Sequence, residues 1–371
     1  MNRGKFWVGL GISVAFLAIF FLTSEPQLLL GTLRQADYVF LFPAIGLYLI
    51  SIFFRALRWN VLLKHIKFIK PIRLYPVVVV GYMANNLLPM RLGEVVRSYY
   101  LSEREGVSKV SALMSIFLER VLDALILILL IVFCIPFSPV FGLAEAFEQH
   151  HGGLYLLTGI ALAFLFFIMF LLLFFAALSP SRAQAIFLFV LKWVPSKFKP
   201  LIAQNIAKLI EGLMSLRKLD TMALLFLLSF PVWLCEAGLF VLIGYSFGLN
   251  DSYQNLIEMA LAMILVTSVA NIASSVPGPP GGIGIFEWIA REVLILIPAT
   301  GIDRTLGTAY VSVVHAALLL PMILFGQLIL WLDHISLVRL YRSSRSSMIS
   351  SDLQADNDDE AHFIKSGDDQ K

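Results

Sequence analysis

Charged residues are scarce in this sequence. Asp, Glu, Lys and Arg make up 14% of its 371 residues, against about 25% in typical soluble domains. Hydrophobic residues make up 59%, and the mean hydropathy is +0.84. A soluble domain of this length cannot bury so much apolar surface, whereas a bilayer can cover it. The composition therefore excludes a soluble globular protein and predicts an all-α, polytopic integral membrane helix bundle.

Motifs for metal binding and catalysis are also lacking. The two cysteines, Cys134 and Cys235, each lie inside an apolar run, and the six histidines form no cluster. No nucleophile–base arrangement or nucleotide-binding loop is present, and no polar stretch reaches ~50 residues, the lower end of domain sizes. We therefore predict no metal, no cofactor, no nucleic-acid partner and no soluble catalytic domain.

Six apolar runs are long enough to cross a bilayer, which takes about 20 residues. They lie near 6–23, 38–57, 111–135, 154–178, 221–247 and 305–332. The first run follows Arg3 and Lys5, as in a signal peptide. It exceeds the usual apolar core of about 7–15 residues, and no small-residue cleavage site follows it. We therefore predict that it stays as the first membrane helix.

Lys and Arg alternate in density between these runs. They are frequent from Arg55 to Arg73 and in 182–218, and absent from 136–153 and 248–256. The positive-inside rule predicts that both basic stretches and both termini lie in the cytoplasm. The predicted location is the plasma or inner membrane of the cell. We expect 182–218 to lie along the membrane surface. Residues 1–340 would form the membrane domain, and 341–371 a disordered acidic tail.

Two further apolar stretches are broken. The stretch 74–101 is interrupted between Gly81 and Glu94, and 257–297 is interrupted by Pro and Gly between Pro277 and Gly284. Pro and Gly clusters disrupt helices, and broken backbone inside a membrane must line protein or a wet cavity. Residues 58–110 must begin and end in the cytoplasm, so we expect the first stretch to enter the membrane from inside and return. Residues 248–304 must begin and end outside, so we expect the second stretch to enter from outside. That pattern is typical of inverted-repeat transporters.

Charges accompany both breaks and one of the spans. Glu119 and Asp123 share a helix face, and Arg120 is placed to pair with Asp123. Such charges cost about 2.5–3.5 kcal/mol each at a helix centre, so they should face the bundle or water. Gly281, Gly282 and Gly284 are placed to offer backbone amides to an anion. We predict that Arg91, Glu94, Glu119, Arg120, Asp123 and Glu287 converge on one cavity near the middle of the bilayer. The histidine at position 315 is interpreted as a packed polar residue, and Glu236 is interpreted as either a functional or a hydrogen-bonded buried acid.

Three motifs occur in order along the chain. They are Asn86-x-x-Pro89-x-Arg91-x-Gly93-Glu94-x-x-Arg97, then Glu119-Arg120-x-x-Asp123, then Pro280-Gly281-Gly282-Ile283-Gly284-x-x-Glu287. With them the chain resembles, over residues 5–335, the flippase-like transmembrane region of lysylphosphatidylglycerol synthases and its free-standing relatives.

The resemblance implies that the chain translocates a lipid and lacks the soluble aminoacyl-transferring domain. It also implies that the chain is not an enzyme. The expected substrate is an anionic phospholipid or a polyprenyl-phosphate-type lipid. A second copy of the chain or a lipid-modifying enzyme is the expected protein partner. The alternatives are a membrane-embedded transferase or a non-transporting scaffold in lipid or envelope glycan biogenesis. The predicted substrate site consists of Asn85, Asn86, Arg91, Glu94, Arg97, Glu119, Arg120, Asp123, Gly281, Gly282, Gly284 and Glu287.

Overall fold

The computed structural model describes residues 26–134, 219–275, 278–297 and 302–337, together with Phe164, Ile168 and Leu340. Every regular element in these ranges is a helix, which confirms the all-α prediction. Several predicted features lie outside the described residues. They are the spans near 6–23 and 154–178, the surface segment 182–218 and the tail 341–371.

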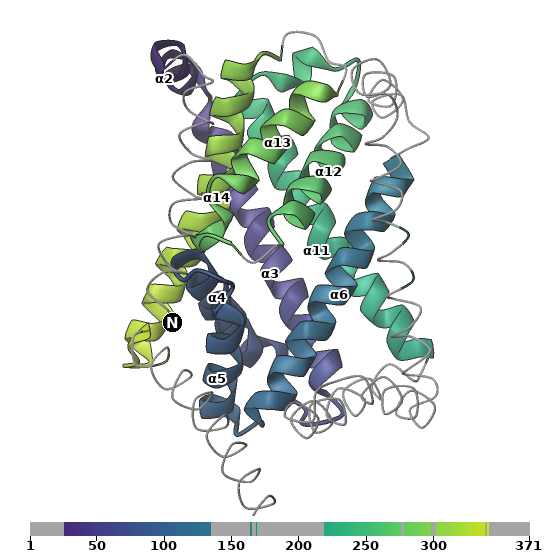
Figure 1. The fold of residues 1–371 in the computed structure, drawn as a ribbon, viewed down its shortest axis with the longest axis vertical. Coiled ribbons are helices and arrows are strands. Elements are labelled where there is room, and N and C mark those ends of the chain that lie inside the picture. Colours follow the sequence, from purple (N-terminus) through teal and green to yellow (C-terminus); the bar gives the residue numbers. More distant parts are fainter. Residues whose placement is uncertain are drawn as a thin grey trace, which may run out of the picture.

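The described helices alternate long spans with shorter, broken segments (Figure 1). In chain order they are α2 (Pro26–Gln35), η1 (Tyr38–Phe40), α3 (Leu41–Leu63), α4 (Pro71–Leu87), α5 (Gly93–Glu105), α6 (Lys109–Cys134), α11 (Leu219–Ser246), η4 (Leu249–Ser252), α12 (Leu256–Ala273), η5 (Pro280–Gly282), α13 (Ile285–Leu296) and α14 (Arg304–Leu332). By length and composition, four of the described helices can cross a membrane: η1 with α3, α11, α12 and α14. Helix α6 is also 26 residues long, but it carries three charges in its first half.

Helix α3 continues past the predicted end of its span. The sequence pattern ended that span at residue 57 and assigned Arg55 and Arg58 to a cytoplasmic basic stretch. The structure corrects this, because α3 runs to Leu63 and both arginines are buried inside the bundle. Lys64, Lys67 and Lys70, which follow, are exposed. The exposed basic stretch therefore begins about nine residues later than predicted.

The first break is shorter than the sequence predicted. Helix α4 remains helical through Gly81 to Leu87, and α5 begins at Gly93. A Cβ atom at Gly81 would lie 2.9 Å from the Arg97 side chain, and one at Gly93 would lie 2.3 Å from the Asn85 backbone nitrogen. The two glycines thus let α5 fold back directly against α4.

The second break separates α12 from α13. Gly281, Gly282 and Gly284 have φ values of 64°, 71° and 95°, a left-handed backbone that glycine adopts without steric cost. Gly281 and Gly282 thus allow the short η5 to form, and Gly284 allows α13 to begin directly after it. The glycine cluster is therefore explained by backbone geometry.

The tips of the two broken segments meet. The Met90 amide donates a hydrogen bond to the Gly278 carbonyl at 2.9 Å, and Arg91 Nη2 donates to the Ser274 carbonyl at 3.0 Å. Figure 1 shows α4 and α5 in the lower part of the molecule and α12 and α13 in the upper part. Lys67, in the connection between α3 and α4, donates to the Glu105 carbonyl at the end of α5, so this segment enters and leaves at the same end. This arrangement agrees with the predicted re-entry from opposite ends.

Apolar side chains form both the core and the outer surface. A continuous core joins α3, α4, α5, α6, α11, α12, α13 and α14. On α14, Leu320, Leu324, Leu328 and Trp331 are exposed. An outer surface of this kind fits lipid rather than water.

Candidate functional site

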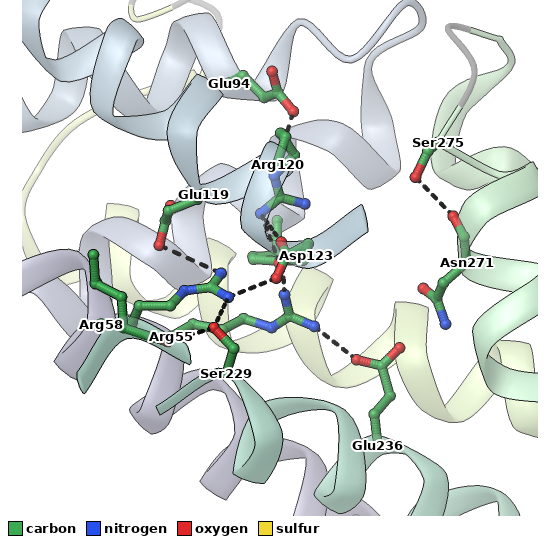
Figure 2. A network of polar contacts seen from close by, with 12 residues as sticks. Arg55, Arg58, Glu94, Glu119, Arg120, Asp123, Ser229, Glu236, Asn271 and Ser275 are labelled. Carbon is green, nitrogen blue, oxygen red and sulfur yellow. Dashed lines mark hydrogen bonds and ion pairs between the residues drawn. The ribbon is translucent and has the colours of Figure 1, made fainter. Parts of the chain in front are cut away.

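The site is centred on Asp123 of α6, whose carboxylate faces three guanidinium groups (Figure 2). Its oxygens lie 2.7 Å from Arg58, 3.2 Å from Arg120 and 3.5 Å from Arg55. The predicted pairing of Arg120 with Asp123 is present. Arg55 and Arg58, three residues apart on α3, bring two of these charges from a helix distant in sequence.

Glu119 lies one turn before Asp123 on the same face of α6, as its spacing predicts. It accepts a hydrogen bond from Arg97 Nη1 at 2.6 Å and lies 3.8 Å from Arg58. The Arg97 guanidinium also stacks over the Trp59 ring at 3.7 Å, a cation–π contact. Glu119 is fully buried and Arg97 nearly so. This pair therefore lies next to Arg58, which contacts Asp123, and it connects α5 to α6.

Glu236 of α11 has a partner, so it is no isolated acid. It accepts a hydrogen bond from Arg55 Nη2 at 2.8 Å, and the two side chains are almost completely buried. The Arg55 guanidinium lies over the rings of Trp233 and Tyr82 at 4.7 Å and 5.3 Å. Arg55 thereby joins α3, α4, α6 and α11 around one cation.

A cavity of about 460 Å³ lies next to this network. This is more than ten times the liquid volume of one water molecule, about 30 Å³. Eight of the predicted site residues line it: Asn85, Asn86, Arg91, Glu94, Arg120, Asp123, Gly281 and Gly282. Lining residues that were not in the predicted site include Tyr48, Arg55, Tyr82, Trp233, Glu236, Asn271 and His315.

Four of the six charged residues that were predicted to converge on one cavity line it. Arg91, Glu94, Arg120 and Asp123 share the cavity wall, and Glu94 lies 3.7 Å from Arg91 and 3.9 Å from Arg120. The remaining predicted residues, Arg97, Glu119, Gly284 and Glu287, are not among the lining residues. Glu119 contacts arginines behind the wall, and Glu287 contacts the wall residue His315.

The glycine loop, residues 278–284 between α12 and α13, does not present free amides at Gly282 and Gly284 as the sequence suggested. The Gly282 amide donates to the Pro279 carbonyl at 3.1 Å, and the Gly284 amide donates to Glu287 Oε2 at 2.7 Å. The Ile283 amide donates to the Pro280 carbonyl. These donors are engaged inside the loop, so the anion-binding role predicted for the amides of Gly282 and Gly284 is wrong. Guanidinium groups, rather than these amides, are the positive groups next to the cavity.

The loop is tied to α14 by a histidine. His315 Nδ1 lies 2.8 Å from Glu287 Oε1, and Nε2 lies 3.1 Å from the Gly281 carbonyl oxygen. The Phe286 ring stacks on the imidazole with a centroid separation of 4.3 Å. The sequence interpretation of His315 as a packed polar residue is right about its burial, but the side chain also forms part of the cavity wall.

Positive charge exceeds negative charge in the described network. Arg55, Arg58, Arg91, Arg97 and Arg120 face four carboxylates, those of Glu94, Glu119, Asp123 and Glu236. Four buried donors on cavity-lining residues have no hydrogen-bond partner within the described part of the chain: Trp233 Nε1, Arg55 Nε and Nη1, and Arg120 Nε. The same holds for one uncharged acceptor, Asn85 Oδ1. An excess cation together with free donors suits a ligand that is rich in acceptors and negatively charged.

Fold and site together define a multi-pass helical membrane protein with a charged cavity between two broken segments. The chain belongs to the family described as the lysylphosphatidylglycerol synthase TM region, whose model matches residues 6–326. This confirms the resemblance drawn from the three motifs.

Relatives were found among archaeal proteins. A UPF0104 membrane protein of Methanothermobacter thermautotrophicus is 26% identical over 80% of this chain and 86% of its own length. A UPF0104 membrane protein of Pyrococcus horikoshii is 25% identical over 81% and 88%. The glycosyltransferase AglD of Haloferax volcanii is 22% identical over 79% of this chain but 49% of its own length. No solved structure matches the chain.

Proposed function

We propose that this protein moves a lipid with an anionic headgroup between the two leaflets of a cell membrane and does not modify that lipid. The excess guanidinium charge of the network next to the cavity is the observation that carries the proposal. A charge at bilayer depth is costly unless it is paired or hydrated, so such charges mark substrate pathways. A phosphate would fit this role, because guanidinium groups bind phosphate oxygens well.

The walls of the cavity suit a molecule with one polar end. Arg91, Glu94 and Arg120 are each about one quarter exposed, while Phe117, Leu127 and Leu319 supply apolar lining. Phe117, one of the lining residues, is 45% exposed. This geometry would let a headgroup occupy the polar part while its acyl chains stay in the bilayer.

Lipid selectivity tests the proposal. In proteoliposomes containing the purified protein, phosphatidylglycerol carrying a fluorophore on one acyl chain should exchange between leaflets. An impermeant quencher of the outer leaflet reports the rate. Phosphatidylcholine with the same fluorophore should exchange more slowly, because its choline group cancels the phosphate charge. Exchange no faster than in protein-free liposomes, or equal for both lipids, would overturn the proposal.

The orientation across the membrane is a separate prediction. We propose that the α3–α4 connection, with Lys64, Lys67 and Lys70, faces the cytoplasm, and that η4 faces outside. In a variant lacking Cys134 and Cys235, a cysteine replacing Asp251 should react with an impermeant thiol reagent added to intact cells. A cysteine replacing Lys70 should react only after lysis. The reverse labelling pattern would contradict this orientation.

A further inference from the structure

The imidazole of His315 lies between two hydrogen-bond acceptors. Glu287 Oε1 faces Nδ1 at 2.8 Å, and the Gly281 carbonyl oxygen faces Nε2 at 3.1 Å. The other carboxylate oxygen, Glu287 Oε2, already accepts the Gly284 amide hydrogen. Both His315 and Glu287 are at least nine-tenths buried. Within the described part of the chain, these are the polar contacts that the two ring nitrogens make.

These contacts require one proton more than an ionised Glu287 and a neutral His315 carry. A neutral imidazole has a single N–H donor, and a carbonyl has none. Both contacts are satisfied when the ring is an imidazolium beside a carboxylate. They are also satisfied when a protonated Glu287 donates to Nδ1 and the neutral ring donates from Nε2. In both arrangements Nε2 carries a hydrogen that it donates to Gly281.

Loss of that proton would change the loop. The remaining ring hydrogen would stay on Nδ1, facing the Glu287 carboxylate, and the Nε2 lone pair would face the Gly281 carbonyl oxygen. Two buried acceptors in contact are unfavourable, so the contact between α14 and the loop would open. The Phe286 ring stacks on the imidazole and holds it in this orientation.

The loop held by His315 forms the contact between the two broken segments. Gly278 in this loop accepts the Met90 amide hydrogen, and a Cβ atom at Gly281 would lie 3.6 Å from the Asn86 carbonyl oxygen. Gly278, Gly281 and Asn86 all line the cavity. A displacement of the loop would therefore change the cavity wall at the point where the two segments touch.

We propose that Glu287 and His315 together bind a proton whose release and uptake drive lipid movement through the cavity. The inference rests on the proposed function and adds its energy source, a proton gradient. Arg291, which is buried on α13 one turn after Glu287, is a charged residue on the same helix. Other charged or titratable groups line the same cavity and set the field at the pair. They are Tyr48 and Arg55 of α3, Tyr82 of α4, Arg91 in the first break, Glu94 of α5, Arg120 and Asp123 of α6, and Glu236 of α11.

Replacing Glu287 by Gln separates proton coupling from lipid movement. The Gln carbonyl can accept the Gly284 amide hydrogen and its amide can donate to Nδ1, which imitates a permanently protonated carboxyl. In proteoliposomes with an imposed pH gradient, the wild type should move labelled phosphatidylglycerol to a leaflet asymmetry that reverses with the gradient. E287Q should still exchange lipid but lose at least nine-tenths of that asymmetry. The exposed His334 provides a control, because H334Q should behave as the wild type.

A spectroscopic measurement tests the proton itself. In lipid nanodiscs, nitrogen NMR of ¹⁵N-histidine-labelled protein, with H315N identifying the signal, should show a protonated Nε2 at pH 7. A bare Nε2 would overturn the proposal whether or not lipid moves. Lipid exchange in the wild type that ignores the gradient would overturn proton coupling and leave the proposed function intact. No exchange of any lipid would overturn both.

Discussion

Replacement of Asp123 by Asn is expected to lower the free energy of unfolding by about 3–5 kcal/mol, the usual cost of breaking a buried ion pair by removing one partner. Asp123 is the carboxylate shared by Arg55, Arg58 and Arg120. Without its charge, Arg55 keeps Glu236 at 2.8 Å, but Arg58 and Arg120 keep only more distant carboxylates, Glu119 at 3.8 Å and Glu94 at 3.9 Å, within the described part of the chain. Repulsion among the three guanidiniums then adds to the lost attraction.

Thermal unfolding of purified protein in detergent measures this effect. D123N should unfold at a clearly lower temperature and give less monodisperse protein. Asp220, exposed in the first turn of α11, provides the control, because D220N removes a solvated charge worth at most about 1 kcal/mol through the helix dipole. Equal unfolding temperatures for D123N and D220N would show that the three arginines do not depend on Asp123.

The helices and the two breaks could be predicted from local sequence. Apolar runs of sufficient length gave α3, α6, α11 and α14, and Pro and Gly clusters gave the breaks. Boundaries were less accurate where a helix carries charge. The pattern ended the second span at residue 57 because Arg55 and Arg58 resemble a cytoplasmic basic stretch. The acids that neutralise them lie on α6 and α11, and no local rule identifies partners 60 to 180 residues away.

The site could be predicted only in part for the same reason. Residues close in sequence to a break, such as Asn85, Asn86, Arg91 and Glu94, were found because the broken backbone marks them. Glu236 was noticed as a buried acid, but its partner Arg55 was not, since it lies 181 residues earlier. A search near the ends of the predicted spans for bases that could pair with the acids Glu119, Asp123 and Glu236 would have pointed to Arg55 and Arg58.

The amides of the glycine loop show a different limit. Three glycines before a helix suggested an anion site, and they are required by positive φ angles. Whether the amides are free depends on the side chain at position 287, which folds back to accept the Gly284 hydrogen. Spacing alone allows both the bound and the free arrangement.

Replacement of Arg120 by Gln is expected to slow exchange of anionic lipid by about 10- to 150-fold. Arg120 is part of the cavity wall, and its side chain is 26% exposed there. Its removal cancels the single excess positive charge of the described network. The loss of one charge-assisted hydrogen bond costs about 1.5–3 kcal/mol, which gives this range. Asp123 keeps Arg55 and Arg58, so R120Q should fold.

The rate of phosphatidylglycerol exchange in proteoliposomes, compared between R120Q and R304Q, tests the central claim most directly. Arg304 is half exposed and pairs with Glu292 away from the cavity, so R304Q removes the same charge outside the proposed pathway. We predict exchange at the wild-type rate for R304Q and at less than one tenth of it for R120Q, with both proteins equally folded. Equal rates for the two variants would contradict the claim that the cavity carries the lipid headgroup.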